Sequence, residues 1–335
     1  MWEDVYTDFM DLPKHEQQKL FNLLKEDFFS NEDTDMSDAY TSIREMRFNE
    51  GLGCVHCGSV KVKRNGKYRD RQRYLCRDCG KSFNDLTNTP ISGTRYLGKW
   101  STFFHLMVEG YTLPRIAERL EIHLSTAFYW RHKVLFALRS LGFQTLKGIV
   151  ESDETFFKES LKGREVVDRK PKKRGGRDKK RGISNLKIAV VVAQDRNGQV
   201  IARKAGTGRV RAEEIDAVIG DYIDQSSLLC TDTATNYKKF ALIKNLKHET
   251  INLSKEGYVK KGIYHLQHVN SYHKRLKDWM QRFQGVATKY LDNYLYWFNV
   301  LQQSKKMTTK QRVNQMLLSA CQKSNPITVN TLREF

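Results

Sequence analysis

Residues 186–204 read LKIAVVVAQDRNGQVIARK, and this stretch decides the fold class. Residues 186–194 form a β-branched, nearly continuous apolar run that is typical of a buried strand. Residues 195–198 include Asp, Asn and Gly, which favour a turn, and residues 200–204 form a second apolar strand pattern. The stretch therefore predicts a β-hairpin.

The segments on either side of this hairpin alternate between strand and helix patterns. Residues 148–157 precede it and predict a strand that leads into acidic residues. The segments that follow predict a helix, a strand, a helix, a strand and two long helices: residues 211–223, 228–231, 236–243, 248–253, 267–283 and 287–303. This alternation predicts an α/β domain, which we assign to residues 147–305.

A basic insertion, residues 158–185, separates the first strand from the hairpin. It is crowded with lysine, arginine and glycine and holds almost no large apolar residue, so it cannot bury a core. We interpret it as a loop that contacts phosphates through Lys172, Lys173 and Arg174, which raises affinity without sequence preference. The alternative is a solvated linker.

The overall charge points to a polyanionic partner. The 335 residues carry a formal net charge of +20, which opposes compaction unless a polyanion neutralises it. An anionic membrane is disfavoured because no stretch approaches the ~20 apolar residues of a span. The N-terminus, MWEDVY, also lacks an apolar signal core. We expect a cytoplasmic, nucleoid-associated protein that binds double-stranded DNA; the alternative is a merely soluble basic protein.

Two Cys-x-x-Cys pairs lie in residues 49–95, which we assign as a zinc ribbon. Cys54 and Cys57 form the first pair, and Cys76 and Cys79 form the second. Four thiolates at this spacing fill the tetrahedral shell of one structural Zn²⁺. Between the pairs, Lys67, Arg71 and Arg73 alternate with tyrosines, a pattern that suits contact with DNA. The alternative is a ribbon that binds only protein.

Residues 96–146 predict a helix-turn-helix domain. Ile116 and Leu120 face inward on a first helix, and Ser125 is placed to cap a second. The second helix would present Arg131 and Lys133 to a major groove. An ordinary helical hairpin is the alternative. We assign residues 1–48 as a helical N-terminal segment and residues 306–335 as a C-terminal tail.

Two aspartates stand at the ends of predicted strands. Asp153 ends the strand before the hairpin, and Asp232 ends the short strand at residues 228–231. Two carboxylates that converge from neighbouring strands bind Mg²⁺ or Mn²⁺ through hard oxygen ligands. An aspartate at a strand end is also a common turn residue, so the pair alone is weak evidence.

Several motifs resemble one family of proteins. They are NDLTNTPISGTRYLGKW at residues 84–100, VESDETFF at 150–157, CTDTATNY at 230–237, and HVNSYHKRLKDWMQRFQGVATKYLDNYLYWF at 268–298. Together with the ribbon and the basic insertion, they resemble bacterial insertion-sequence transposases of the ISXO type over residues 45–304. The resemblance implies an RNase H-like, retroviral-integrase-like catalytic core with a DDE-type active site.

The resemblance also implies roles for individual residues. Asp153 and Asp232 would be the first two metal ligands, and the third falls at Asn270, where many transposases have glutamate. Lys277, two helical turns later, would contact a DNA phosphate. We expect a working Asp-Asp-Asn set that holds two Mg²⁺ or Mn²⁺ ions. Glu154 is a candidate of second rank, expected on the opposite face of its strand. His268 and His273 flank Asn270, and for each we expect a role in the core or in DNA contact in preference to metal ligation.

The expected function is that of a DNA transposase. The ribbon and the helical domain would bind the terminal inverted repeats of a mobile element, and the core would cleave each end. The freed 3′ hydroxyl would then attack target DNA, and pairing of two ends implies a homodimer or larger assembly. The alternatives are a non-catalytic DNA-binding regulator with the same ribbon and helical domain, and a nuclease on the same fold.

Overall fold

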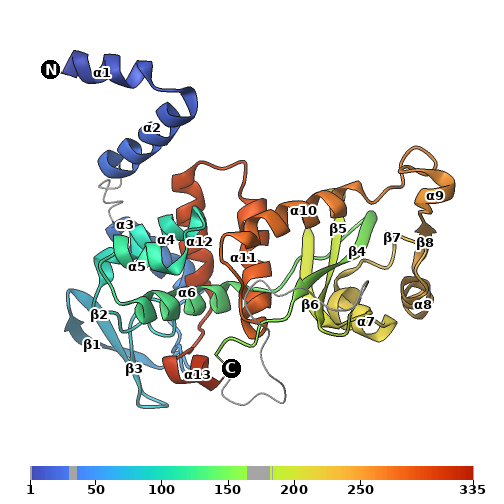
Figure 1. Cartoon of the computed structure of the whole chain (residues 1–335). Coiled ribbons are helices and arrows are strands. Elements are labelled where there is room, and N and C mark those ends of the chain that lie inside the picture. Colours follow the sequence, from blue (N-terminus) through green and yellow to red (C-terminus); the bar gives the residue numbers. More distant parts are fainter. Residues whose placement is uncertain (1, 30–35, 164–181, 183, 335) are drawn as a thin grey trace.

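A computed structural model of the chain describes residues 2–29, 36–163, 182 and 184–334 (Figure 1). A three-stranded sheet lies towards the N-terminus, and a five-stranded sheet carries the C-terminal half. Helices stand between the two sheets and cover the larger one (Figure 1). No helix in the part of the chain that is described combines the length and apolar character of a membrane span.

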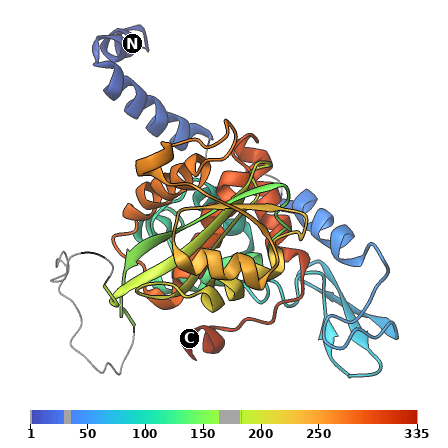
Figure 2. The same ribbon diagram turned by 90° about the vertical axis from the view of Figure 1, so that its right-hand side faces the viewer.

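The first three helices precede the smaller sheet. They are α1 (Trp2–Asp11), α2 (Lys14–Phe29) and α3 (Met36–Phe48). The first two project away from the rest of the molecule in both views (Figures 1 and 2). The third packs against the body of the protein, where Ile43 is fully buried.

The smaller sheet contains the four clustered cysteines. Its antiparallel strands are β1 (Val62–Tyr68), β2 (Arg71–Cys76) and β3 (Ser82–Phe83). Figure 2 shows that this sheet stands to one side of the larger sheet. The architecture is that of a zinc ribbon, in agreement with the fold class predicted from the sequence.

The helical region that follows begins with a short 3₁₀ turn. Its elements are η1 (Leu97–Lys99), α4 (Trp100–Val108), α5 (Leu113–Arg119) and α6 (Leu124–Arg139). The predicted cap of the second helix is wrong by two residues. The N-cap of α6 is His123, whose side chain accepts a hydrogen bond from the amide of Ser125. Ser125 itself lies in the first helical turn.

The larger sheet has strand order β6-β5-β4-β7-β8. Its strands are β4 (Ile149–Lys158), β5 (Lys187–Asp195), β6 (Val200–Thr207), β7 (Leu228–Thr231) and β8 (Lys247–Thr250). β5 is antiparallel to both of its neighbours, whereas β4, β7 and β8 run parallel. β5 and β6 confirm the predicted hairpin, and this order with one reversed strand is the arrangement of an RNase H-like core.

Helices cover both faces of this sheet. One face packs against α7 (Ala212–Ile219), η2 (Gly220–Tyr222) and α8 (Thr235–Ile243). The other packs against α10 (Gln267–Gln281), η3 (Thr288–Tyr290) and α11 (Leu291–Gln303), while α9 (Leu253–Glu256) follows β8 at the edge. Val190 and Val192 of β5 point to the α10–α11 face, and Val191 points to the other. This alternation is what a strand covered on both sides requires.

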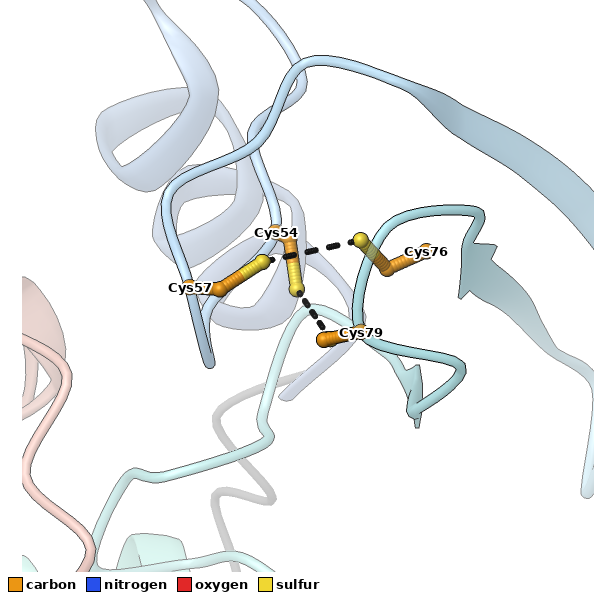
Figure 3. Close-up of side chains that lie close together, drawn as sticks. All are labelled: Cys54, Cys57, Cys76 and Cys79. Carbon is orange, nitrogen blue, oxygen red and sulfur yellow. Dashed lines mark hydrogen bonds between the residues drawn. The ribbon is translucent and has the colours of Figure 1, made fainter.

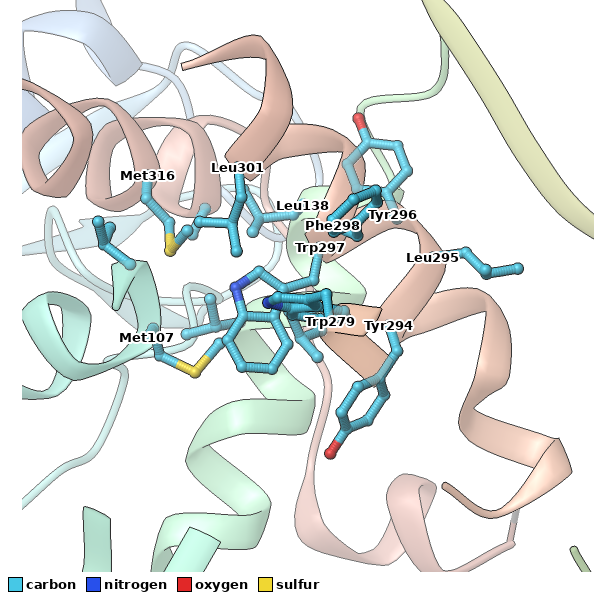
Figure 4. Packing of buried hydrophobic residues seen from close by; sticks show 14 of the residues in the cluster. Met107, Leu138, Trp279, Tyr294, Leu295, Tyr296, Trp297, Phe298, Leu301 and Met316 are labelled. Carbon is cyan, nitrogen blue, oxygen red and sulfur yellow. The ribbon is translucent and has the colours of Figure 1, made fainter. Parts of the chain in front are cut away.

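Helix α11 joins the helical region to the sheet. It is buried along most of its length, and Leu295, Trp297 and Phe298 are at most 2% exposed. Figure 4 shows Trp297 and Trp279 packed among side chains that include Met107 of α4, Leu138 of α6 and Met316. One continuous core therefore runs from the helical region to the sheet.

The C-terminal residues take part in this core. The sequence predicted only a tail at residues 306–335, but α12 (Thr309–Gln322) and α13 (Val329–Glu334) lie there. Met316, Leu317 and Cys321 of α12 are at most 1% exposed. The helix contributes an apolar face that packs against α3, α4 and α6.

Candidate active site

The strand register places the two predicted aspartates side by side. β4 and β7 pair in parallel, with Glu151 opposite Cys230. Two residues further along, Asp153 lies within β4 and Asp232 directly follows the end of β7, so the two aspartates stand at neighbouring positions of a sheet whose strands are about 5 Å apart. In each carboxylate the Oδ1 atom accepts a backbone amide hydrogen bond, from Glu154 at 2.8 Å and from Ala234 at 2.9 Å respectively.

The electrostatics of Asp153 reflect this pairing. Burial, aided by the charge of Asp232, raises the pKa of the Asp153 carboxyl to about 6, while the Glu154 amide and Lys277 act in the opposite direction. A carboxylate that lies beside a second negative charge is stabilised by positive charge placed between the two groups. Cations bound there would relieve this repulsion.

Helix α10 faces Asp153 across a cavity of about 890 Å³. Asn270 and Lys277 both line this cavity from the same face of the helix, together with His273. His273 Nδ1 lies 3.8 Å from Asp153 Oδ2, and burial lowers the pKa of its imidazole to about 4, so the ring is neutral. Asp232 lies beside Asp153 but not on the cavity wall.

Glu154 is directed to the other face of the sheet. Its Oε1 atom accepts a hydrogen bond of 2.9 Å from Asn236 of α8. Burial raises the pKa of the Glu154 carboxyl to about 7, and the charges of Asp153 and Asp232 raise it as well. Three carboxyl groups therefore share one negative field near the middle of β4, from both faces of the strand.

The oxygen atoms gathered here suit a hard divalent cation. Mg²⁺ and Mn²⁺ prefer carboxylate and carbonyl oxygens, and Asp153, Asp232 and the amide oxygen of Asn270 are ligands of this type. Asp153 retains a raised pKa that a bound cation would lower. The donor set fits the ions that the sequence predicted.

A second charged cluster holds α10 in its place opposite β4. Glu151, two residues before Asp153, is fully buried. Its Oε2 atom accepts hydrogen bonds from the amides of His268 and Val269, at 2.9 and 3.2 Å, at the start of α10. Its Oε1 atom lies 2.9 Å from Nη1 of Arg196 and 2.8 Å from Nδ1 of His268. The carboxylate therefore connects the strand of Asp153 to the helix of Asn270.

The residues of this cluster are of types that bind metals, but the positive charge beside Glu151 comes from the side chain of Arg196. Ligand atoms of Glu151, His265 and His268 lie within 4.8 Å of one another. Nη1 of Arg196 is 2.8 Å from His265 Nε2 and 2.7 Å from His268 Nδ1, in addition to its ion pair with Glu151. The guanidinium thus occupies the position that a metal ion would take.

The four cysteines of the ribbon converge as predicted. Their Sγ atoms all lie within 4.8 Å of one another (Figure 3). Cys54 and Cys79 are 3.7 Å apart, and Cys57 and Cys76 are 3.6 Å apart (Figure 3). A tetrahedron of sulfur atoms about 2.3 Å from a central zinc ion has edges of about 3.8 Å. The cluster therefore has the dimensions of a structural zinc site.

The ribbon has little else to hold it together. Its own buried cluster consists of Cys54, Cys76, Tyr74 and Phe83. Hydrogen bonds from the amides of Cys79 and Asp78 lower the pKa of the Cys76 thiol to about 6, which favours the thiolate form that binds metals. So small a core needs a metal or a neighbouring element for stability.

Two of the predicted DNA contacts are wrong because the side chains are engaged within the protein. Arg131 is fully buried, with its guanidinium over the rings of Trp297 and Phe283. Arg71 pairs with Asp85 at 2.8 Å and lies over the ring of Tyr40, and its side chain is only 17% exposed. Both arginine side chains therefore form contacts between packed elements and do not face solvent.

The other predicted contacts differ in exposure. Lys67 is exposed on β1, whereas Arg73 and Lys133 are half-buried. Half of the residues of α6 are buried and only Leu124 and Ser125 are exposed, so only its first turn is free for a groove. Three further predicted contacts lie outside the described residues: Lys172, Lys173 and Arg174.

Sequence reasoning missed three residues of the site. Glu151 lies two residues before Asp153, and strand alternation would have placed both on one face. Arg196 occupies a hairpin turn, and Asn236 lies in the first turn of α8; neither carries a local signal for its partner. Their roles follow only from the tertiary arrangement.

Comparison with known proteins identifies the domain that carries this site. The ISXO2-like transposase domain family matches residues 145–299. We refer to these residues as the transposase domain because of this similarity. The match confirms the resemblance predicted from the sequence, and the transposase domain contains Asp153, Asp232, Asn270 and Lys277.

Similarity to a curated protein extends beyond the transposase domain. A protein from Halobacterium salinarum, described as an uncharacterized protein in transposable element ISH50, is 29% identical over 285 residues. The similarity covers 83% of this chain and 94% of that protein. It therefore includes much of the chain before residue 145.

Two solved structures of Mos1 also match. A pre-cleavage Mos1 transpososome is 12% identical with a TM-score of 0.21, over 66% of this chain and 78% of that one. A Mos1 transposase paired-end complex with the left transposon end is 14% identical with a TM-score of 0.23, over 67% and 80%.

Removing one zinc ligand is expected to abolish metal binding by the ribbon. The Cys57→Ser variant should lose its ion, and zinc content should fall from about one per chain to near zero, because three thiolates leave the tetrahedral shell open. Elemental analysis of the purified full chain measures this. Cys230→Ala, which changes a buried cysteine of β7, is the control and should keep its zinc. Equal zinc content in both variants would contradict the assignment.

Replacing Glu151 by glutamine is expected to destabilise the transposase domain. The change removes the buried charge that faces Arg196 and the α10 amides, and breaking such a pair costs about 3 kcal/mol. Chemical denaturation of the full chain measures the loss. Glu213→Gln removes an exposed ion pair with Lys239 and should leave the unfolding midpoint unchanged. A wild-type midpoint for Glu151→Gln would show that the cluster does not hold α10.

Proposed function

We propose that this protein is a DNA transposase that binds the terminal inverted repeats of a mobile element and carries out metal-dependent strand cleavage and strand transfer. The observation that supports this most is the placement of Asp153 within β4 and of Asp232 directly after the parallel neighbour β7, with Asn270 and Lys277 of α10 facing Asp153 across the cavity. This is the oxygen-rich arrangement that phosphodiester chemistry with divalent cations requires.

Each residue of the site has a distinct part in this proposal. Asp153 and Asp232 hold the cations, and the amide oxygen of Asn270 completes the set without adding charge. Lys277, one to two turns further along the same helix face, binds a phosphate oxygen next to the scissile bond. When bound, the metal ions activate the attacking hydroxyl and stabilise the leaving oxygen.

The remaining parts of the chain would bind the DNA. We infer that the ribbon holds one structural Zn²⁺ and contacts the element ends, aided by exposed Lys67 and the first turn of α6. The basic insertion would add affinity for phosphates without sequence preference. Pairing of two ends calls for a homodimer or larger assembly. Support also comes from the relative in transposable element ISH50, which aligns along most of both chains.

The aspartates offer the most direct test. Asp153→Asn and Asp232→Asn should each lower metal-dependent DNA cleavage by about a thousandfold or more, because losing a ligand removes several kcal/mol of charge stabilisation. The substrate is a duplex with the inverted repeats that flank the gene, with Mg²⁺ or Mn²⁺. Asp221→Asn, on the exposed η2 turn, is the matched control and should cut like the wild type. Unchanged cleavage by both site variants would refute the proposal.

Two rival functions predict other outcomes of the same assay. A DNA-binding regulator would bind the duplex but leave it uncut in the wild type. A nuclease on the same fold would cut, but it would not join pre-cleaved ends with free 3′ hydroxyls to a target plasmid. Joined product that depends on Asp153 and Asp232 separates a transposase from both.

The third ligand is tested by Asn270→Ala. The variant should need a higher Mn²⁺ concentration for half-maximal cleavage, roughly 10- to 100-fold, because one oxygen ligand is lost. A titration of cleavage rate against Mn²⁺ measures the shift, and Ser271→Ala, the exposed neighbour on α10, serves as the control. An unchanged Mn²⁺ requirement would move the third ligand elsewhere, with Glu154 and His273 next in line.

A further inference from the structure

A second cavity lies where the helical region meets the transposase domain. It has a volume of about 350 Å³, within the range of sites that hold small molecules. Phe128 and Arg131 of α6 form one side, and Phe283 and Tyr290 form another. Lys162 and Lys289 also line it. None of these residues has a part in the catalytic site described above.

The buried Arg131 makes this cavity electrostatically unusual. Arg131 is fully buried, and its Nε atom has no hydrogen-bond partner within the described part of the chain. Its other contacts are the carbonyl of Tyr111, the hydroxyl of Tyr294 and two aromatic rings. No carboxylate of the described residues pairs with it. An uncompensated buried charge is costly, so an anion that enters the cavity would be stabilised.

The two lysines add to this positive charge. Lys162 donates to the carbonyl of Gly285 at 3.0 Å, and Lys289 donates to that of Gly163 at 3.4 Å. Both are therefore held over the cavity by carbonyls, and neither forms an ion pair with a described carboxylate. Burial, together with the charges of Arg131 and Lys289, lowers the pKa of His132, another lining residue, to about 3.

The rest of the wall is aromatic. The rings of Phe128 and Tyr290 meet edge to face with centroids 5.6 Å apart, and His132 lies against Tyr290 at 4.1 Å. The Tyr290 hydroxyl donates to the carbonyl of Leu332 at 3.3 Å, which fixes the ring. Ring faces combined with clustered cations are what proteins use to hold a nucleobase together with its phosphate.

The cavity lies next to the catalytic cleft. Gln281 lines the cleft and Phe283 lines the second cavity, so at most about 7 Å of chain separates the two walls. On the other side, Lys158 belongs to the cleft and Lys162 to the cavity. The Ser160 amide donates to Thr288 Oγ1 at 2.9 Å, and the Thr288 amide donates to the Ser160 carbonyl at 3.0 Å. These two hydrogen bonds fix the segment from Lys158 to Lys162 against Thr288, so the cleft and the cavity keep their relative positions.

We propose that this cavity takes one unpaired nucleotide of the DNA strand that leaves the catalytic cleft. Its base lies against the rings of Tyr290 and Phe128, and its phosphate lies between Lys162 and Lys289 with Arg131 behind them. The inference rests on the proposed function, because that function places a DNA strand in the cleft. Holding a nucleotide out of the base stack costs a few kcal/mol, which stacking on the aromatic rings and contacts with the lysines would offset.

Photochemical cross-linking tests where the base lies. The full-length, zinc-loaded Asp153→Asn/Asp232→Asn protein is irradiated without divalent metal in complex with a single-stranded oligonucleotide that carries 5-iododeoxyuridine. Cross-linked tryptic peptides are then identified by mass spectrometry. The expected products are the peptides of residues 290–305 and 120–131, which hold Tyr290 and Phe128. Cross-links confined to other peptides would overturn the proposal.

Binding of an unlabelled oligo(dT) to variants gives an independent measurement. Tyr290→Leu keeps an apolar side chain but loses the stacking surface, and it should weaken binding by about 5- to 100-fold. Tyr258→Leu, at a 73% exposed tyrosine, is the matched control.

The salt dependence of binding tests the phosphate contact. Lys289→Met should lower the slope of log affinity against log salt by about 0.7. Its control is Lys305→Met, which changes an exposed lysine. The site would be refuted if Tyr290→Leu bound oligo(dT) with wild-type affinity and Lys289→Met kept the wild-type salt slope. Because the two variants are measured separately, poor folding of one leaves the other as a test.

This test is separate from that of the proposed function. If the wild type cleaves and joins DNA but the cross-links fall elsewhere, only the nucleotide cavity is refuted. If the cross-links fall on Tyr290 but Asp153 and Asp232 prove dispensable for cleavage, the cavity stands and the transposase proposal fails.

Discussion

The parallel pairing of β4 with β7 is the constraint on which the rest of the structure depends. Parallel neighbours need a crossover connection, and here the β5–β6 hairpin and α7 provide it. Because Glu151 pairs with Cys230, Asp153 and Asp232 reach the same level of the sheet. A slip of one residue between these strands would turn one aspartate to the opposite face. The buried apolar run of β5, with alternate residues in two cores, fixes the register that the acidic site needs.

This arrangement concentrates negative charge in a strongly basic protein, and the surrounding structure offsets part of it. Burial and mutual repulsion raise the pKa of Asp153 and of Glu154, each of which also accepts a hydrogen bond. Glu151, on the same strand, is neutralised by Arg196 and by the amides at the start of α10. The same contacts set the position of Asn270 two residues later. The contacts that neutralise Glu151 are therefore the same contacts that position α10.

The features that could be predicted from the sequence are those with a local pattern. The β5–β6 hairpin follows from an apolar run and a turn, and the cysteine cluster follows from spacing alone. A place on the predicted second helix favours DNA contact by Arg131, and a basic stretch of the ribbon favours it for Arg71, but the burial of the two side chains depends on Trp297 and Asp85, which lie outside these local patterns. The cap of α6 and the partner of Glu151 likewise depend on neighbours that only the folded chain supplies.

The burial of α6 changes how the helical region can act on DNA. A recognition helix needs an exposed polar face along its first turns, yet Trp130, Arg131 and Val134 pack into the core shared with α11. The sequence predicted an outer-surface position for Arg131, but its charged side chain lines an internal cavity beside the transposase domain. Because α11 packs against both α6 and β6, the wall that carries Arg131 cannot move independently of the sheet that carries Asp153. The helical region and the transposase domain therefore share one packed core.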